Sequence, residues 1–156
     1  MLNINIPGYG DLSFKHIVCD YNGTLACDGM LLPGVAEMIR KVSVNLEVHV
    51  VTADTFGIAQ QSLSGLPVNL TILPQGNEDK AKCNYVANLN PDTVAALGNG
   101  RNDRLMLRKA VVGICLLQAE GTSAETLCDA DIICRSAKEA LELFDNPKRL
   151  IATLRR

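Results

Sequence analysis

Short apolar runs alternate with longer amphipathic segments along most of this chain. The apolar runs lack the strict polar alternation of strands that face water on one side, so we expect strands with helices on both faces. The predicted strands span residues 15–19, 46–52, 68–73, 93–97, 111–117 and 131–134. The predicted helices span residues 34–44, 55–64, 78–89, 102–110, 122–128, 136–144 and 147–155.

Repeated strand–helix units of this length predict the α/β class. Because parallel neighbours are joined by right-handed crossovers, the units should form a doubly wound, Rossmann-like parallel sheet with helices on both faces. Before it, residues 2–6 are expected to pair near residues 12–16 through a turn at 7–10, in a short hairpin that extends one edge. Neither a linker nor a repeat interrupts the pattern, so residues 1–156 should form a single domain.

The composition narrows the class of protein. Of 156 residues, 47% are hydrophobic and 21% are charged, as in a soluble globular protein. The net charge of −2 gives no electrostatic reason to expect nucleic acid or an anionic membrane as a partner. The longest apolar stretch, 110–117, is too short to cross a bilayer, and the first residues do not resemble a signal peptide. We therefore expect a cytoplasmic protein whose six cysteines, none in a CxxC pair, are reduced.

Two glycine-containing motifs follow predicted strands. Residues 20–25 read Asp-Tyr-Asn-Gly-Thr-Leu, and residues 98–103 read Gly-Asn-Gly-Arg-Asn-Asp. In an open parallel sheet, ligands bind outside the carboxyl ends of the strands. Asp20, Thr52, the loop before the 78–89 helix and Asn99 should therefore face one crevice. Carboxylates there can attack phosphorus or hold a hard cation, while glycines let backbone amides approach anionic oxygens. The sequence thus predicts a phosphate and metal site.

Four motifs within residues 14–134 resemble, in the same order, those of the haloacid dehalogenase (HAD) superfamily. They are Asp20-x-Asn-Gly-Thr-Leu, Thr52-Ala-Asp54, a lysine in the 78–89 helix, and Gly98-Asn-Gly-x-Asn-Asp103. They are more closely similar to the phosphorylation domain of P-type ATPases and to the small soluble proteins that share it. Membrane helices are not expected, so ion pumping is excluded. A cap domain is not expected either, because only one helix fits between the first motif and Thr52.

The resemblance implies that Asp20, Asn22, Thr52 and Lys82 form the catalytic set. Asp20 would be the nucleophile that forms an aspartyl-phosphate, although an acid there could also cap a turn. Lys82 would neutralise charge on the nucleophile and the phosphoryl group, and its spacing fits better than that of Lys80. The implied phosphate-binding residues are Gly23, Thr24, Thr52, Ala53, Lys82 and Asn102.

The implied cofactor is Mg²⁺. Its ligands would be Asp20, the backbone carbonyl of Asn22, Asn99, and Asp103 directly or through a water. Asn99 stands where the family usually has an acid, so the affinity for Mg²⁺ should be lower. Asn102 would orient Asp103 or the phosphate. Asp54 completes a Thr-x-Asp motif but could equally cap the helix that follows it.

A second asparagine bears on the rate. Most HAD phosphatases have an acid two residues after the nucleophile, whereas Asn22 cannot carry a proton. Losing a general acid–base group reduces a rate by about 10²–10⁴. The chain is thus predicted to be a slow, Mg²⁺-dependent phosphatase acting on a phosphorylated small molecule or phosphoprotein, with an open site or one covered by a second subunit. The alternatives are a catalytically weakened phosphate- or partner-binding regulatory module, and an oligomeric scaffold with a vestigial site.

Overall fold

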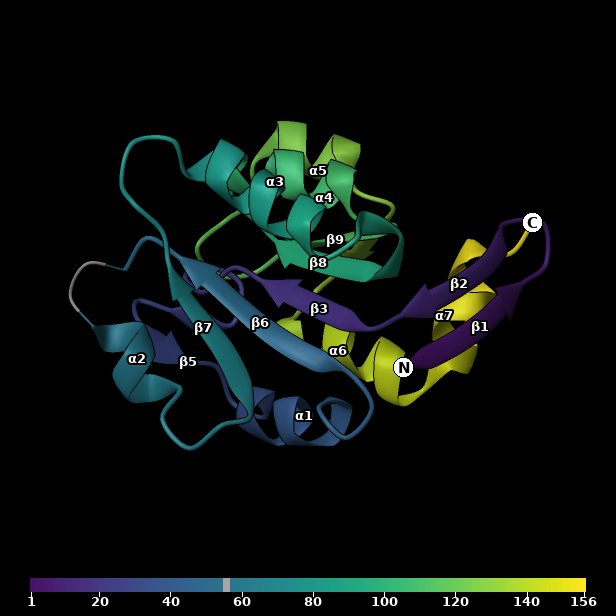
Figure 1. Ribbon diagram of the computed structural model, residues 1–156, viewed down its shortest axis with the longest axis horizontal. Coiled ribbons are helices and arrows are strands. Elements are labelled where there is room, and N and C mark those ends of the chain that lie inside the picture. The colour runs from purple at the N-terminus through teal and green to yellow at the C-terminus, as the bar shows by residue number, and fades with distance from the viewer. Residues whose placement is uncertain (55–56) are drawn as a thin grey trace.

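A six-stranded parallel sheet forms the centre of the protein (Figure 1). The computed structural model describes residues 1–54 and 57–156. The strands of the sheet are β3 (His16–Cys19), β6 (Glu47–Thr52), β7 (Val68–Ile72), β8 (Val94–Gly98), β9 (Val112–Leu116) and β10 (Ile132–Cys134). Each lies within one residue of its predicted ends, so the α/β prediction is confirmed.

The order of the strands makes the sheet doubly wound. From one edge to the other it runs β10-β9-β8-β3-β6-β7. The chain therefore enters at the central strand β3, builds outward through β6 and β7, and then returns to place β8 on the other side of β3. At such a reversal the loops that leave the two central strands diverge, which opens a crevice at their carboxyl ends.

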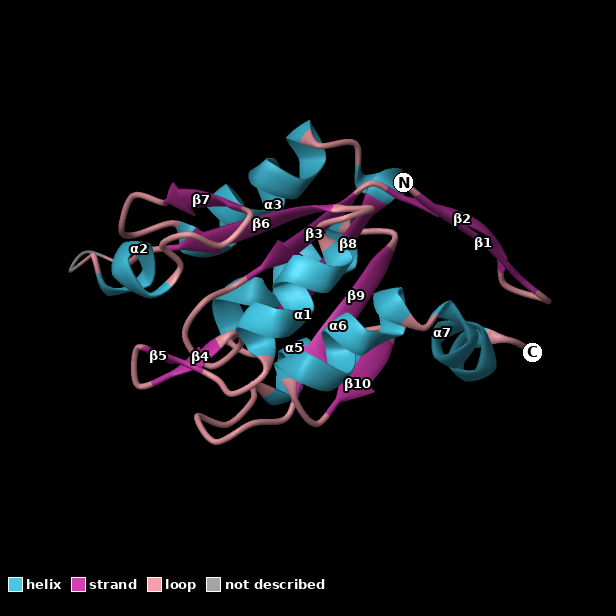
Figure 2. Cartoon of the chain, turned by 90° about the horizontal axis from the view of Figure 1, so that it is seen from below, coloured by secondary structure: helices cyan, strands magenta, loops and turns pink. Residues whose placement is uncertain are grey.

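Helices cover both faces of the sheet, as predicted. One face lies under α3 (Glu78–Asn88), α4 (Arg104–Lys109) and α5 (Ala124–Asp129); the other lies under α1 (Val35–Val42) and α6 (Ala137–Asp145) (Figure 1, Figure 2). Every residue of β8 and β9 is consequently buried. The short helix α2 (Ile58–Ser62) falls within the predicted 55–64, of which residues 55 and 56 lie outside the described residues.

The N-terminal hairpin is present, but its predicted place at a sheet edge is wrong. β1 (Leu2–Ile6) pairs with β2 (Gly10–Phe14) as a separate two-stranded sheet. Because β2 leads through Lys15 directly into the central strand β3, the hairpin leaves the middle of the sheet and cannot reach an edge. It projects outward beside α7 (Pro147–Leu154), as Figure 1 shows. The ring of Phe14 packs edge-on against the ring of Phe144 on α6, with 5.3 Å between the ring centroids.

A second hairpin was not predicted. β4 (Ala26–Cys27) and β5 (Met30–Leu31) pair directly after the first motif, around a turn in which Asp28 has a φ of +50°. Two residues a strand are too few to show an alternating pattern. The Tyr21 hydroxyl donates to the Gly29 carbonyl oxygen at 3.0 Å, which ties this hairpin to the loop after β3.

Two further expectations concern the whole chain. All six cysteines are free, as predicted. Among the described residues, we find no helix that is both long and apolar enough to cross a membrane.

Candidate active site

The ends of the central strands surround one cavity of about 410 Å³. Asp20 follows β3, Thr52 ends β6 and Asn99 follows β8, so the expected convergence at the carboxyl edge is observed. Ala53 and Asp54 continue from Thr52 along the cavity wall. The remaining lining residues are Asn22, Glu78, Lys82, Gly100, Asn102 and Glu120.

Lys82 joins two of the predicted carboxylates. Its Nζ lies 2.7 Å from Asp20 Oδ1 and 2.7 Å from Asp103 Oδ1. Lys82 and Asp103 are 1% and 0% exposed, and Asp20 is 7% exposed at the cavity wall. Lys80, the other candidate lysine, is exposed on the same helix. Helical periodicity thus directs Lys82 inward and Lys80 outward.

Burial and neighbouring charge shift the pKa of both ionised partners. Burial raises the pKa of Asp20 to about 7, and the charge of Asp103 adds to this, while Lys82 acts in the opposite direction. For Lys82, burial alone would lower the pKa, but Asp103 and Asp20 together raise it above its usual value. The lysine therefore stays charged and partly compensates the two carboxylates beside it.

The glycine-framed turn after β8 holds Asp103. Its Oδ2 accepts hydrogen bonds from the backbone N–H groups of Asn99 and Gly100, each at 2.9 Å. A Cβ on Gly98 would lie 2.5 Å from the Cβ of Asp103, so only glycine allows this approach. Both oxygens of Asp103 thus bond to the protein, one to the turn and the other to Lys82.

Asn99 connects the first and the last motif. Its Nδ2 donates to the Gly121 carbonyl oxygen at 2.9 Å, and its Oδ1 accepts from the Thr24 hydroxyl at 3.2 Å. Gly23 lies against it with a φ of +77°, and a Cβ there would lie 2.4 Å from Asn99 Nδ2. The Thr24 N–H also has a protein partner, the carbonyl oxygen of Tyr21 at 3.2 Å. In this structure, Thr24 thus stabilises the loop after β3 through its hydroxyl and its backbone N–H group.

The other predicted residues lie at the cavity rim or wall. Asn22 is exposed, and Thr52 is 4% exposed. Asp54 Oδ2 accepts from the Ala59 N–H at 2.7 Å, which supports the helix-capping alternative for this acid. Asn102 donates through Nδ2 to Glu78 Oε2 at 2.9 Å, so it contacts α3 rather than Asp103 through this atom.

Three residues at the site were not predicted. Glu78 and Glu120 line the cavity, and Glu120 Oε1 accepts from the Asp28 N–H at 2.8 Å. Gln118 Nε2 donates to the carbonyl oxygens of Gly23 and Thr24 at 2.9 and 2.8 Å. Gln118 and Glu120 follow β9, so the strand-end argument, extended to that strand, would have found them. Glu78 begins α3, directly after the loop expected at the crevice, but no motif singles it out.

The donor set fits a hard divalent cation. Oxygen donors at the cavity include the Asp20 carboxylate and the side chain of Asn99, and Asp54, Glu78 and Glu120 add negative charge around them. Lys82 is the cation among the lining residues that the structure describes. A phosphate ester would meet this acidic wall with repulsion unless Mg²⁺ offset it, and Mg²⁺ prefers oxygen ligands of this kind.

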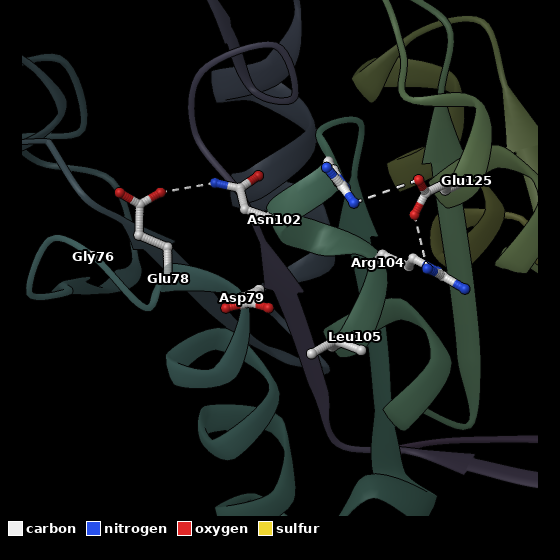
Figure 3. Close-up of a pocket in the computed structure, with 8 residues that line it drawn as sticks. Gly76, Glu78, Asp79, Asn102, Arg104, Leu105 and Glu125 are labelled. Atoms are coloured by element: carbon white, nitrogen blue, oxygen red, sulfur yellow. Dashed lines mark hydrogen bonds and ion pairs between the residues drawn. The ribbon is translucent and has the colours of Figure 1, made fainter.

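A second hollow of about 490 Å³ adjoins the first. Glu78 and Asn102 line both, and Figure 3 shows their hydrogen bond across the space between α3 and the turn after β8. On the far side, Arg104 Nη1 pairs with Glu125 Oε2 at 2.8 Å (Figure 3). The hollow thus offers polar and charged groups of both signs beside the cavity.

Solved structures with the same fold include several phosphatases. The 3-deoxy-D-manno-octulosonate 8-phosphate (KDO 8-phosphate) phosphatase from Moraxella catarrhalis, solved with magnesium, phosphate and KDO, has a TM-score of 0.71 at 16% identity. The match covers 91% of this chain and 94% of that one. The cobalt-bound enzyme of the same kind from Haemophilus influenzae has a TM-score of 0.65 at 10% identity, over 89% and 97% of the two chains. A protein described as a HAD superfamily hydrolase of subfamily III A from Legionella pneumophila has a TM-score of 0.73 at 14% identity, over 90% and 86%.

These structures agree with the HAD fold expected from the four motifs, whereas the closer likeness to P-type ATPases stays a prediction. No family model matches the chain. "Uncharacterized protein MJ0073" from Methanocaldococcus jannaschii is 39% identical over an alignment of 84 positions, which covers 51% of this chain and 90% of that protein. The chain therefore has the HAD fold and belongs to the same family as this Methanocaldococcus protein.

Proposed function

We propose that this protein is a Mg²⁺-dependent phosphohydrolase that forms an aspartyl-phosphate on Asp20 and hydrolyses it slowly. The observation that carries the proposal is the placement of Lys82 Nζ, 2.7 Å from both Asp20 and Asp103, at the wall of a cavity at the switch point of the sheet. A nucleophilic carboxylate needs a fixed cation close by, because negative charge gathers there as phosphorus is attacked.

The first chemical step would join Asp20 to phosphorus. One carboxylate oxygen of Asp20 is held by Lys82, and an oxygen of this carboxylate attacks the phosphoryl group. The ester P–O bond breaks, and its electron pair leaves on the departing oxygen. Thr52, at the end of β6, lines the cavity, and its hydroxyl would donate to a phosphoryl oxygen. In the second step, water attacks phosphorus and passes a proton to solvent, and the bond between phosphorus and the Asp20 oxygen breaks. Inorganic phosphate leaves, and the Asp20 carboxylate is restored.

Mg²⁺ would be held by Asp20, the carbonyl oxygen of Asn22 and the amide oxygen of Asn99, with Asp103 acting through a water. When bound, it supplies positive charge to the transferring phosphoryl group. Asp103 is fully buried and bonds to Lys82 and to two backbone N–H groups, which favours the water-mediated role.

Slow turnover follows from the residue at position 22. Asn22 lies at the cavity and cannot protonate a leaving oxygen or activate water. Two of the nearby carboxylates are engaged, Asp54 with the Ala59 N–H and Glu78 with Asn102. The departing group would therefore take its proton from solvent, which lowers the rate by about 10²–10⁴.

The substrate class is a phosphate monoester of a small molecule. The structures with this fold include KDO 8-phosphate phosphatases, one of them solved with magnesium and phosphate. The hollow between Glu78 and Arg104 would receive the part of the substrate beyond phosphorus.

The test is hydrolysis of p-nitrophenyl phosphate with and without Mg²⁺. We expect weak, Mg²⁺-dependent activity that Asp20→Asn abolishes and that the exposed control Asp92→Asn leaves unchanged. We also expect Asn22→Asp to raise kcat by about 10²–10⁴, because it restores a proton carrier. Activity that persists in Asp20→Asn would refute the mechanism.

A second candidate is a phosphate-binding regulatory module. Asn22 and Asn99 favour it, since the HAD resemblance implies acids at these two positions and neutral amides stand there. It predicts that beryllofluoride with Mg²⁺ binds at Asp20, measured by ¹⁹F NMR, while neither the wild type nor Asn22→Asp turns over a phosphate ester. Turnover by Asn22→Asp would favour the enzyme instead.

A further inference from the structure

A second group of metal-ligating side chains lies at the opposite end of the sheet from Asp20. His16 is the first residue of β3, and Glu47 is the first residue of β6. These two residues are register partners in the parallel pair, and His49 follows two positions after Glu47. Because side chains alternate along a strand, Glu47 and His49 point to the same face, the one covered by α3.

The three side chains approach one another as the corners of a nearly regular triangle. His16 Nδ1 lies 3.1 Å from His49 Nε2, and Glu47 Oε2 lies 3.7 Å from the first nitrogen and 3.8 Å from the second. The two ring nitrogens share a hydrogen bond, which a bound ion would replace, whereas both distances to the carboxylate exceed those of hydrogen bonds. A point equidistant from the three atoms lies about 2.1 Å from each of them, which is the length of a bond from zinc to nitrogen or oxygen.

A hydrogen bond with Tyr85 orients the ring of the buried His49. The side chain of His49 is 5% exposed, and its Nδ1 lies 2.9 Å from the hydroxyl of Tyr85 on α3. If Nδ1 carries the proton and donates it to this hydroxyl, the lone pair of Nε2 faces His16. Histidines that bind metals almost always engage their second ring nitrogen in this way, because the bond fixes the tautomer and the ring.

The open side of the triangle faces solvent. The side chains of His16 and Glu47 are 14% and 66% exposed. Both residues line a hollow of about 580 Å³, together with Met1, Lys15 and residues 43–46. An ion could enter through this hollow, and water could complete its coordination.

We propose that His16 Nδ1, His49 Nε2 and Glu47 Oε2 form a binding site for a divalent transition-metal ion of the zinc type. Two imidazole nitrogens distinguish this site from the all-oxygen donor set around Asp20, which suits Mg²⁺. The ion would clamp the beginnings of β3 and β6 together. It would stabilise the folded chain, since an unfolded chain does not hold the three ligands in place.

The proposal can be tested by titrating the full chain with Zn²⁺ in a calorimeter, in an excess of Mg²⁺ that occupies oxygen-donor sites. We expect one Zn²⁺ per chain. Glu47→Gln and His16→Gln should each weaken its binding at least about tenfold. Both changed side chains reach solvent, so the variants should fold, and circular dichroism in EDTA checks this.

A matched control comes from the second cluster of possible ligands, Cys27, Asp28 and Glu120. Cys27→Ser should keep the Zn²⁺ affinity of the wild type. Thermal unfolding gives a second readout: Zn²⁺ should raise the Tm of the wild type and of Cys27→Ser but not that of Glu47→Gln. Co²⁺ should produce visible absorption bands that are lost in His16→Gln.

Two results would overturn the proposal. One is a Zn²⁺ affinity that stays the same in Glu47→Gln and His16→Gln. The other is binding that disappears only in Cys27→Ser, which would move the ion to the other cluster. Neither result depends on phosphatase activity, because none of the three ligands lines the Asp20 cavity.

Discussion

At the scale of single residues, Lys82 determines the character of the cavity. It lies almost fully buried with two carboxylates, so three ionisable groups share a site that water barely reaches. The arrangement leaves one net negative charge when all three are ionised. Without the lysine, two negatively charged carboxylates would lie close together in the protein interior, which does not stabilise unpaired charges.

Lys82→Met should therefore destabilise the fold, in addition to removing the proposed phosphatase activity. Breaking a buried ion pair by removing one partner costs about 3–5 kcal/mol, because it leaves an uncompensated charge. The free energy of unfolding, measured in urea at neutral pH, should fall by this amount. Lys80→Met, on the exposed side of the same helix, should change it by less than about 0.5 kcal/mol. Equal effects of the two variants would contradict this account.

At the scale of elements, the sequence predicts the strands of the sheet well, together with the site residues that follow those strands or lie on α3. Strands such as β8 are buried on both faces, so an apolar run marks them clearly. The position of Lys82 follows from helical spacing once the helix is recognised. The β4–β5 hairpin and the contacts of Glu120 depend on where loops meet after folding, which no local pattern encodes.

The predicted 102–110 helix shows how a side chain can alter an element. The structure has a 3₁₀ turn at Arg101–Asp103 and then α4 from Arg104. Asp103 accepts from the backbone N–H groups of Asn99 and Gly100 and so closes the tight turn before the helix. The sequence alone shows only a helical pattern there.

The contact of Gly23, in the loop after β3, with Asn99 can be tested by substitution. Gly23 and Gly65 have φ values of +77° and +75°, so alanine is strained at both, by about 1–2 kcal/mol. A Cβ on Gly23 would meet Asn99 at 2.4 Å, whereas one on Gly65 has nothing within 4 Å. Gly23→Ala should therefore destabilise the fold by about 1–3 kcal/mol more than Gly65→Ala. Matched urea titrations measure the difference, and equal losses would argue against a tight contact.

Glu142 links α6 to α7, and this link should depend on pH. Hydrogen bonds from Lys138 and Arg149, at 2.8 Å each, lower the pKa of Glu142. The pKa of Glu142 is thus lower in the folded chain than in the unfolded chain, where it is near 4.5. The stability that this carboxylate contributes is therefore fully present above pH 4.5, and it is lost as the pH falls through the pKa of the folded state. Glu142→Gln should thus be less stable than the wild type at pH 7, by an amount that shrinks below pH 4.5. A difference that grows on acidification would contradict this.

At the scale of the whole molecule, the fold combines a buried sheet with a hairpin that extends from it. β1 and β2 have their apolar side chains covered by the C-terminal helices, and Arg156 N donates to the Pro7 carbonyl oxygen at 3.1 Å. The N-terminal hairpin and the C-terminal helix α7 thus support each other at the end away from the cavity (Figure 1).

Leu150→Ala should destabilise the unit formed by the N-terminal hairpin and α7 more than the central sheet. Leu150 is fully buried on α7, so its truncation should cost about 2–5 kcal/mol. Hydrogen exchange should accelerate first in β1, β2 and α7, while amides of β8 keep their protection relative to global unfolding. Leu117→Ala, at a side chain that is 48% exposed, serves as the control and should change little. Uniform acceleration across the sheet would show that the hairpin is not a separate unit.

The two hydrogen bonds of Asn99 have a consequence for any substitution at this position. Its Nδ2 gives a proton to the Gly121 carbonyl oxygen, and its Oδ1 receives one from Thr24. An aspartate at this position would place an oxygen, without a proton, against the Gly121 carbonyl. Asn99→Asp would therefore be unfavourable in this background unless the loop at Gly121 changed as well. The two partners of the side chain thus select an amide at position 99.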